Sequence, residues 1–401
     1  MADEVKRRGR GWKILGIVVG IILVCVGGLL LWVSAVSGRK LDQMDAKTKA
    51  MAAEWRARPA ERPVLRGTAE PGNAWDDYNP ALTAIRATKD ISRLGMLVTR
   101  DPKGDPEWGR TTLATHAKTL EGLRQGAGRT TCRFPYDWEA GASVQTPSLL
   151  AAQSLGNLAV LHARALAEAG KPREAAGVLL DILQFGRDVG HDGVLICEMI
   201  GAAVLQLGLW EIRDLMKANL LDAAALRDLD AGLAVLDGSF PNHGHVLSNE
   251  AIFSCTELRT QAASANVFFR LLFADGFDRM VDMMEGAAKA ETLPWQEVEA
   301  QRVVLERKAR SGWNPLTKEL MPGLGGTNKV TRHRLAQLRT LRMAIRGKLG
   351  GDALDLDDPF GAKLKSDGAL KTWSVGPDGA DDGGDGSWDL KGKDIVLDLG
   401  K

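Results

Sequence analysis

Four aspartates near the end of the chain have the residue type and spacing to bind a hard cation. Asp378, Asp381, Asp382 and Asp385 lie within eight residues, separated by glycines that permit tight turns. Calcium takes several oxygen ligands from flexible loops, so this segment is a candidate Ca²⁺ site. It is not an EF-hand, because no glutamate closes a loop of about 12 residues. All four carboxylates are candidate ligands.

A second set of residues could hold zinc. His243 and His245 flank one glycine, and Glu250 follows closely. Imidazole nitrogen and carboxylate oxygen suit that ion, but no cysteine or third histidine lies at ligand spacing. The favoured interpretation is a polar loop that leads into a helix, and the alternative is a metal-dependent hydrolase that uses these three residues.

Other catalytic signatures are missing from the sequence. It contains no HExxH, no GxSxG and no Walker loop. Charged residues do occur inside apolar helical segments, namely Asp181, Arg187, Glu198 and Glu211. A charge that faces a core must be paired or neutralised, so we expect these four to form structural ion pairs.

An aromatic cluster has near-helical spacing and consists of Phe268, Phe269, Leu272, Phe273 and Phe277. Core packing is the favoured interpretation. The alternatives are a groove for an apolar ligand and contact with a bilayer surface.

These residues must be positioned by a chain of 401 residues that begins with an apolar segment. Ile14 to Val36 are 23 residues without a charge, and about 1.5 Å per residue gives ~35 Å, enough to cross a bilayer. We predict a transmembrane helix at 14–36, with Gly16 and Gly20 as a candidate dimerisation pair. Cleavage as a signal peptide is the alternative, although the apolar run is longer than usual for one.

Charges on the two sides of the segment favour one orientation. Five basic residues precede it and four follow it, so residues 1–13 are predicted to be a cytoplasmic tail. The bulk of the chain then lies on the extracytoplasmic side of a bacterial inner membrane.

Beyond the span, we predict a juxtamembrane helix and linker at 37–72 and an all-α domain at 73–350. Leucines and alanines recur at helical spacing on both sides of Gly170-Lys171-Pro172, which predicts an antiparallel helix pair whose turn resembles a tetratricopeptide repeat. Single helices are expected at 106–126 and at 246–288, the second broken or bent near Gly276. The apolar stretch 194–210 contains Glu198 and Gln206, so a core helix explains it better than a second span.

Residues 351–401 form an Asp/Gly-rich tail of different composition. They hold 12 Asp and six Lys, and their alternating runs predict a small β element with a tight turn at Asp367-Gly368. The helix at 329–348 carries seven basic residues and no acid. We expect the acidic tail to neutralise it. The predicted fold class is therefore mainly α, with a small C-terminal β element.

Several tail motifs resemble the carboxy-terminal segment of type II secretion major pseudopilins. They are Asp358-Pro-Phe-Gly361, Trp373-Ser-Val-Gly-Pro-Asp-Gly379, Gly383-Gly384-Asp385-Gly386 and Asp394-Ile395. The resemblance implies calcium binding by the loop, with Asp378 and Asp385 as the best ligand candidates and Asp381 and Asp382 behind them. It also makes a component of a pseudopilus-like assembly an alternative function. The amino terminus departs from the family, because it lacks the Gly-Phe-Thr-Leu-Ile-Glu signature. The whole layout is similar to a broad group of uncharacterised bacterial envelope proteins.

The net charge of +1 excludes a uniformly basic nucleic-acid-binding protein. Stacked helical hairpins commonly form extended binding surfaces. We therefore expect a membrane-anchored, non-enzymatic scaffold or adaptor that binds a protein or peptide partner.

Overall fold

The computed structural model describes residues 2–144, 146, 148–311, 314–315, 326–368, 370–389 and 393–400, and it describes side chains from Ile17 onward except those of Ala142 and Leu149. The helices are α1 Ala2–Ala57, α2 Ala74–Arg86, α3 Arg93–Val98, α4 Pro106–Thr115, α5 Ala117–Ala127, the 3₁₀ helix η1 Trp138–Ser143, α6 Leu149–Glu168, α7 Pro172–His191, α8 Leu195–Lys217, α9 Ala223–Gly238, α10 His243–Ser264, α11 Val267–Ala290, α12 Trp295–Arg310 and α14 Thr327–Lys348. The strands are β1 Glu70–Asn73, β2 Arg129–Thr131, β3 Lys365–Asp367, β4 Lys371–Ser374, β5 Gly386–Ser387 and β6 Asp394–Asp398.

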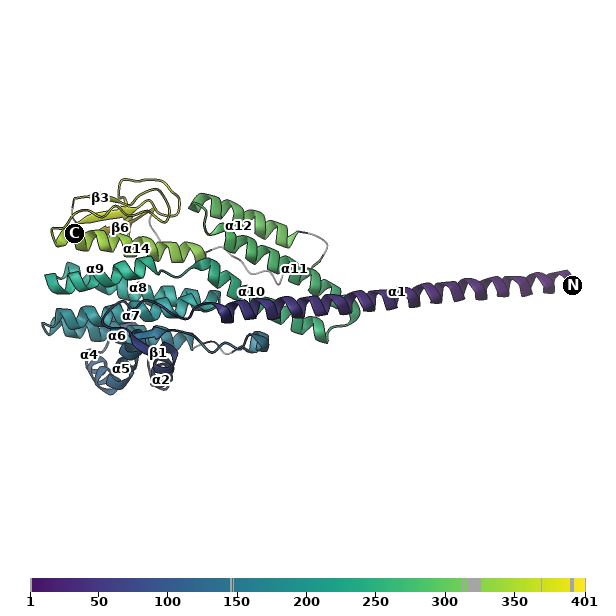
Figure 1. Cartoon of the computed structure of the whole chain (residues 1–401), viewed down its shortest axis with the longest axis horizontal. Helices are drawn as coiled ribbons and strands as arrows, with labels where there is room; N and C mark the ends of the chain where they lie inside the picture. Colours follow the sequence, from purple (N-terminus) through teal and green to yellow (C-terminus); the bar gives the residue numbers. More distant parts are fainter. Residues whose placement is uncertain are drawn as a thin grey trace.

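Helix α1 projects far beyond the rest of the molecule (Figure 1). Its large apolar side chains between Ile17 and Trp32 are exposed, and the helix is long and apolar enough to span a membrane. From Val33 onward one face is buried against α10 and α11, with Ser37 and Met44 on the same stripe. The predicted span and juxtamembrane helix are thus one continuous helix, and the expected boundary at residue 36 is not a break.

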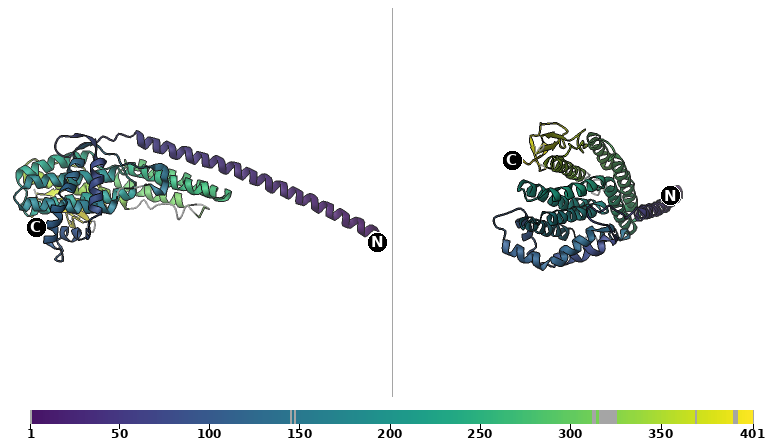
Figure 2. Two further views of the ribbon diagram at one scale, coloured as in Figure 1. Left: turned by 90° about the horizontal axis from the view of Figure 1, so that it is seen from below. Right: turned by 60° about the vertical axis from the view of Figure 1, so that its left-hand side comes forward.

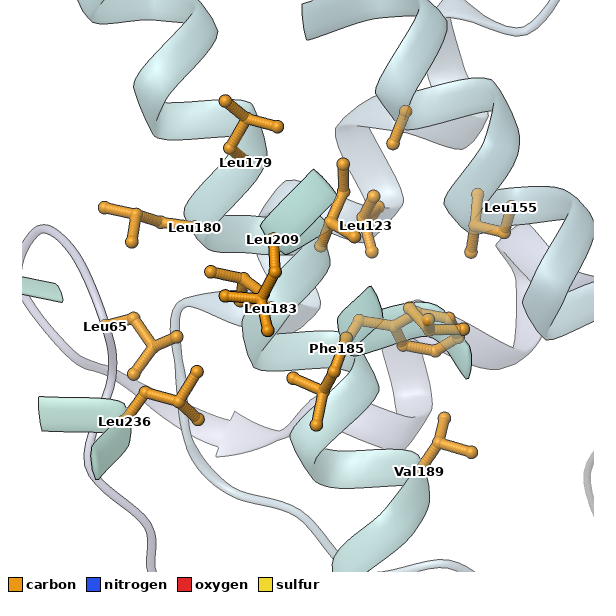
Figure 3. Packing of buried hydrophobic residues seen from close by; sticks show 14 of the residues in the cluster. Leu65, Leu123, Leu155, Leu179, Leu180, Leu183, Phe185, Val189, Leu209 and Leu236 are labelled. Atoms are coloured by element: carbon orange, nitrogen blue, oxygen red, sulfur yellow. The ribbon is translucent and has the colours of Figure 1, made fainter. Parts of the chain in front are cut away.

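The centre of the body is α7, which is surrounded by α5, α6, α8 and α9. Every residue from Leu179 to Gly190 is buried, and leucines from the neighbouring helices pack around Leu183 and Phe185 (Figure 3). The predicted helix pair is confirmed as α6 and α7, with Gly170 at φ +75° where the chain turns. The tetratricopeptide-like character of this pair stays a prediction.

Helix α8 contains the second apolar stretch. It also has the length and composition to cross a membrane, but more than half of that stretch is buried in the body. It packs against α6, α7 and α14, as expected for a core helix.

Three secondary-structure predictions were wrong. The helix expected at 246–288 is two helices, because Asn266 accepts hydrogen bonds from the amides of Phe268 and Phe269 and starts α11 there. The expected break or bend near Gly276 falls instead at Ala265 and Asn266, and Gly276 lies inside α11. The helix expected at 106–126 ends and restarts at His116. The domain at 73–350 is also not purely helical, because β2 pairs in parallel with β1.

The tail forms a four-stranded sheet of order β3-β4-β6-β5 against α14 (Figure 1). The predicted turn is confirmed: Asp367 pairs with Lys371 in the antiparallel β3–β4 hairpin, and Gly368 has φ +71°. Phe360, Val375 and Ile395 form a small core with Trp295 and Ala336. This core attaches the tail to both α12 and α14.

The direct ion pairs described for the basic helix are made with acids outside the tail, and the tail contributes only weaker charge interactions, such as that of Asp357 with Arg339. Arg339 and Arg342 of α14 contact Asp237 at 2.8 and 2.6 Å, and Arg346 contacts Asp230 at 2.6 Å. Both acids belong to α9, which packs beside α14. Towards the tail, arginines of α14 donate hydrogen bonds to backbone carbonyl groups: Arg339 to that of Asp357 and Arg332 to that of Pro359.

Candidate functional site

Two clefts adjoin at the first turn of α10. One, of about 400 Å³, lies between α10, α11 and the end of α1. The other, of about 430 Å³, lies between α10, α11 and α14. Asn242 and Ala288 line both of them. We call the pair of clefts the Asn242 groove.

The local sequence explains why the groove forms there. Asn242 caps α10 by accepting a hydrogen bond from the amide of Gly244 at 2.9 Å. A side chain at Gly244 would stand 3.1 Å from the carbonyl oxygen of Ala288. Since glycine has no such side chain, α10 and α11 approach closely at this level.

His243 lies on the α14 side of the groove and is buried. Its Nδ1 lies 2.7 Å from the Glu198 carboxylate and therefore donates to it, while the Thr331 hydroxyl donates to the same carboxylate at 2.8 Å. Burial lowers the pKa of His243, but the hydrogen bond and charge of Glu198 outweigh it, so the pKa is raised. This pair closes the floor of the cleft.

His245 lies on the α1 side and is exposed. Its ring stands edge-on to that of His191, with 5.9 Å between the centroids. The surrounding protein and the Arg58 guanidinium lower the pKa of His245. Successive helical positions differ by about 100°, so residues two apart point to nearly opposite faces.

Glu250 is used elsewhere. Its carboxylate accepts hydrogen bonds from the amide of Leu195 at 3.0 Å, at the start of α8, and from the Ser254 hydroxyl at 3.3 Å. His243, His245 and Glu250 therefore do not converge on one point. Among the described residues, no group of three or more His, Cys, Asp or Glu side chains is arranged to hold a metal.

Residues that the sequence did not single out give the α1 side its charge. Glu54 lies in the last turn of α1 and Arg58 directly follows the helix, while Glu285 and Lys289 lie in the last two turns of α11, and all four line the cleft. Each pair has i,i+4 spacing, which was the available signal. Nothing in the sequence indicated that the two pairs would meet.

The charges expected to be structural are paired. Arg66 holds Asp181 with two hydrogen bonds of 2.7 and 2.6 Å, and Arg164 holds Glu211 at 2.9 and 2.6 Å. Glu198 has His243. Each of these acids is buried, so the pairing satisfies groups of the core.

Arg187 belongs to a buried network that the sequence did not reveal. It contacts Asp188 at 3.2 Å, and Asp188 also receives the Tyr78 hydroxyl at 2.9 Å and the Arg62 guanidinium at 3.3 Å. The network joins α2, the 58–69 segment and α7. Arg62 and Tyr78 lie more than 100 residues before Asp188 in the chain, which is why spacing alone did not suggest the network.

The four tail aspartates lie in one loop but have different partners. Asp378 and Asp385 are exposed. Asp381 accepts from Lys365 and from the Trp373 indole, and its pKa falls to about 2 because of those bonds. Asp382 faces Lys393 at 3.4 Å.

The carboxylate that shapes this loop is Asp394, which the sequence placed only in a motif. It is fully buried and accepts hydrogen bonds from the amides of Gly384 at 2.8 Å and Asp382 at 3.4 Å. It therefore fixes the backbone between the candidate ligands.

The aromatic cluster is divided. Phe277 is buried, Leu272 and Phe273 are half-buried, and Phe268 and Phe269 are exposed. The expectation of core packing therefore holds for Phe277 and fails at the start of α11.

In the candidate dimerisation pair, no atom lies within 4 Å of the position that a side chain would take at Gly20. The surroundings of Gly16 lie outside the part of the structure described at side-chain level.

Comparison with known protein families, with curated proteins and with solved structures gives no significant match to this chain.

Proposed function

We propose that this chain is a single-pass protein of a bacterial inner membrane that acts as a non-enzymatic adaptor. The Asn242 groove binds an extended peptide segment of a protein partner. The observation that carries the proposal is that two clefts flank the first turn of α10 and share Asn242 and Ala288 in their linings.

The lining of the groove favours a peptide over a compact small molecule. Met51 and Ala288 supply apolar surface, while Glu285 and Lys289 add opposite charges on the α1 side. On the α14 side, Glu291 accepts from Asn328 at 2.7 Å and lies 3.7 Å from Arg332. Apolar surface with a few fixed polar groups suits side chains that alternate along an extended segment.

The orientation proposed for the chain follows from its flanking charges. Five basic residues lie before the apolar part of α1 and four follow it, which favours a body, with its groove, outside the cytoplasm.

Photo-crosslinking of the full chain in native membranes tests the proposal. A photoreactive amino acid at Asn242, His245 or Lys289 is expected to capture the same partner from all three positions. The matched control is Lys103, which is exposed in the loop between α3 and α4. Lys289→Glu should reduce capture from Asn242 about tenfold, since it reverses a charge on the groove.

Two results would contradict the adaptor function. One is equal labelling at Lys103 and at the groove positions. The other is hydrolysis of an ester or peptide library by the purified chain that disappears in His243→Ala, which would instead support the hydrolase alternative.

A further inference from the structure

The turn between α10 and α11 exposes two phenylalanines. Phe268 and Phe269 are 58% and 49% exposed, whereas Phe277, two turns later, is buried. Large aromatic side chains on a surface require an explanation when they are adjacent.

Two ion pairs give the direction of α11 relative to α1. Lys40 contacts Asp278 at 2.9 Å and Lys47 contacts Glu285 at 2.7 Å. Both helices advance by seven residues between the two contacts, so they run parallel. The first turn of α11 therefore points along α1 towards its apolar part.

The same pairs give the level of the phenylalanines. Phe268 precedes Asp278 by ten residues, about 15 Å of helix, whereas Val36 precedes Lys40 by four, about 6 Å. Even when the length of the lysine side chain is allowed for, Phe268 reaches the level at which the apolar run of α1 ends. Figures 1 and 2 show the α10–α11 turn as the part of the body that extends furthest along α1.

The uncharged end of the α10–α11 turn lies near the level at which the uncharged part of α1 ends. On α1, the first charge after the apolar run is Arg39. On the other two helices, Arg270 is the only charged residue between Arg259 and Asp275. The uncharged part of the turn therefore adjoins the end of the uncharged part of α1.

The polar groups of the turn are bonded within it. Asn266 accepts from the amides of Phe268 and Phe269, both at 3.2 Å. The Arg270 guanidinium donates to the carbonyl groups of Ala265 at 3.0 Å and Ala263 at 3.4 Å. Helix ends that satisfy their own backbone groups are what a region of low polarity requires.

We infer that the α10–α11 turn inserts Phe268 and Phe269 into the interfacial layer of the same bilayer that α1 crosses. This inference rests on the membrane span of the proposed function. Aromatic rings are favoured at that depth, and a helix start with exposed apolar side chains is suited to it. The body is then held to the membrane at two points, which fixes the direction in which the groove faces.

Depth-dependent fluorescence quenching tests the inference on the full chain. In a Cys25→Ser background, single cysteines at Leu23, Phe268 and Leu370 are labelled with an environment-sensitive dye; the remaining native cysteines are buried. The chain is reconstituted in vesicles of phosphatidylethanolamine and phosphatidylglycerol with doxyl-labelled phosphatidylcholine.

Dye at Leu23 and at Phe268 should be quenched, the second at least half as strongly as the first. Dye at Leu370, an exposed leucine of the tail, should be unaffected. A dye at Phe269 repeats the measurement and guards against a local effect of the Phe268 substitution.

The outcomes separate the inference from the proposal beneath it. If Leu23 is quenched while Phe268 and Phe269 behave like Leu370, the span stands and the inference is overturned. It is also overturned if the dye at Phe268 is shielded from water but insensitive to doxyl lipid, because a protein surface then covers the turn. If Leu23 itself is not quenched, the membrane span fails and the inference fails with it.

Discussion

Two buried histidines, His243 and His333, have pKa values that their surroundings shift in opposite directions. The pH dependence of stability should therefore differ in sign between them. His243 donates to Glu198, and its pKa is raised. His333 meets the carbonyl oxygen of Trp388 at 3.3 Å, and burial together with the Arg334 charge lowers its pKa to about 3. The first histidine is stabilised by a proton and the second is destabilised by one.

His243→Asn tests the first of these. The asparagine amide can replace Nδ1 as a donor to Glu198, but it cannot be protonated. A group whose pKa is raised in the folded state stabilises the fold below its unfolded pKa of about 6.5, and this contribution is lost as the pH rises through the folded value. We therefore expect the variant to be less stable by about 1–3 kcal/mol near pH 6 and closer to wild type at high pH. Urea denaturation across this range measures the difference, and a difference independent of pH would exclude the protonated pair.

His333→Gln should show the opposite slope. The glutamine amide can still donate to the carbonyl of Trp388. Because the folded pKa of His333 lies below the unfolded value, wild type loses up to about 1.4 kcal/mol of stability for each pH unit below 6.5 through this residue. The variant should therefore gain relative to wild type as the solution is acidified. The same denaturation series checks this, and equal acid sensitivity of the two proteins would contradict it.

At the scale of elements, glycine sets how closely α7 and α8 pack. A methyl group at Gly201 would lie 2.6 Å from both the carbonyl oxygen of Gly186 and the amide nitrogen of Gly190. These are backbone atoms of a buried helix, so neither can move aside cheaply. The high glycine content of the chain thus has a structural cause in its helices as well as in its turns.

Gly201→Ala should destabilise the chain by at least about 1–3 kcal/mol, because α7 and α8 must separate. The matched control is Gly276→Ala on α11, where nothing lies within 4 Å of the new methyl group. Alanine in a helix interior is better than glycine by roughly 0.5–1 kcal/mol, so this variant should be as stable as wild type or more so. Thermal unfolding followed by circular dichroism compares them; equal melting temperatures for Gly201→Ala and wild type would refute the close crossing.

The tail loop provides a prediction about calcium. The loop is already ordered by Asp394 and by the contacts of Lys365 and Lys393 with Asp381 and Asp382. If Ca²⁺ also binds there through Asp378, added CaCl₂ should raise the melting temperature of wild type, by linkage, and leave Asp378→Ala unchanged. Asp352→Ala, an exposed aspartate outside the loop, should respond like wild type. If CaCl₂ does not change the melting temperature of wild type, the calcium prediction is wrong, and Asp394 and the two lysines alone order the loop.

The sequence predicted helices and turns well where glycine and proline mark a turn. It predicted them poorly where a single cap residue starts a helix, and it missed ion pairs between residues that are distant in the chain. Gly170-Lys171-Pro172 located the α6–α7 turn, whereas the start of α11 depends on the single cap Asn266 and was missed. Summed charge suggested that the tail neutralises α14, but Asp237 does so because α9 packs beside it across about 100 residues of sequence. For His243 and His245 the sequence predicted a polar loop, with a zinc site as the alternative, whereas both residues lie in the first turn of α10 and line different clefts. Treating them as one ligand set overlooked the opposite directions that residues two apart take on a helix.

At the scale of the whole molecule, α1 is one continuous helix that holds both the exposed apolar segment and the docking surface of the body. Because the helix is continuous, residues inserted into it change both the distance of the body from the apolar segment and the rotation of the body about the helix axis. In the proposed membrane arrangement, the position of the body above the bilayer is therefore set by the number of residues between the apolar run and the docked stripe that begins near Val33.

A seven-residue polar helical insertion after Val36 tests this coupling. It adds about 10.5 Å to α1 and, at about 100° per residue, turns the following stripe by only about 20°. Ser37 and Met44 thus keep their contacts with α10 and α11, and the contact made by Val33 is lost. Dye at Phe268 should lose its quenching by doxyl lipid, because the turn is lifted out of the interface, while dye at Leu23 keeps it. The same seven residues placed in the exposed loop at Lys103 should change neither signal. Quenching at Phe268 that survives the insertion after Val36 would mean that the turn contacts the membrane independently of α1, and that the continuous helix does not set the height of the body.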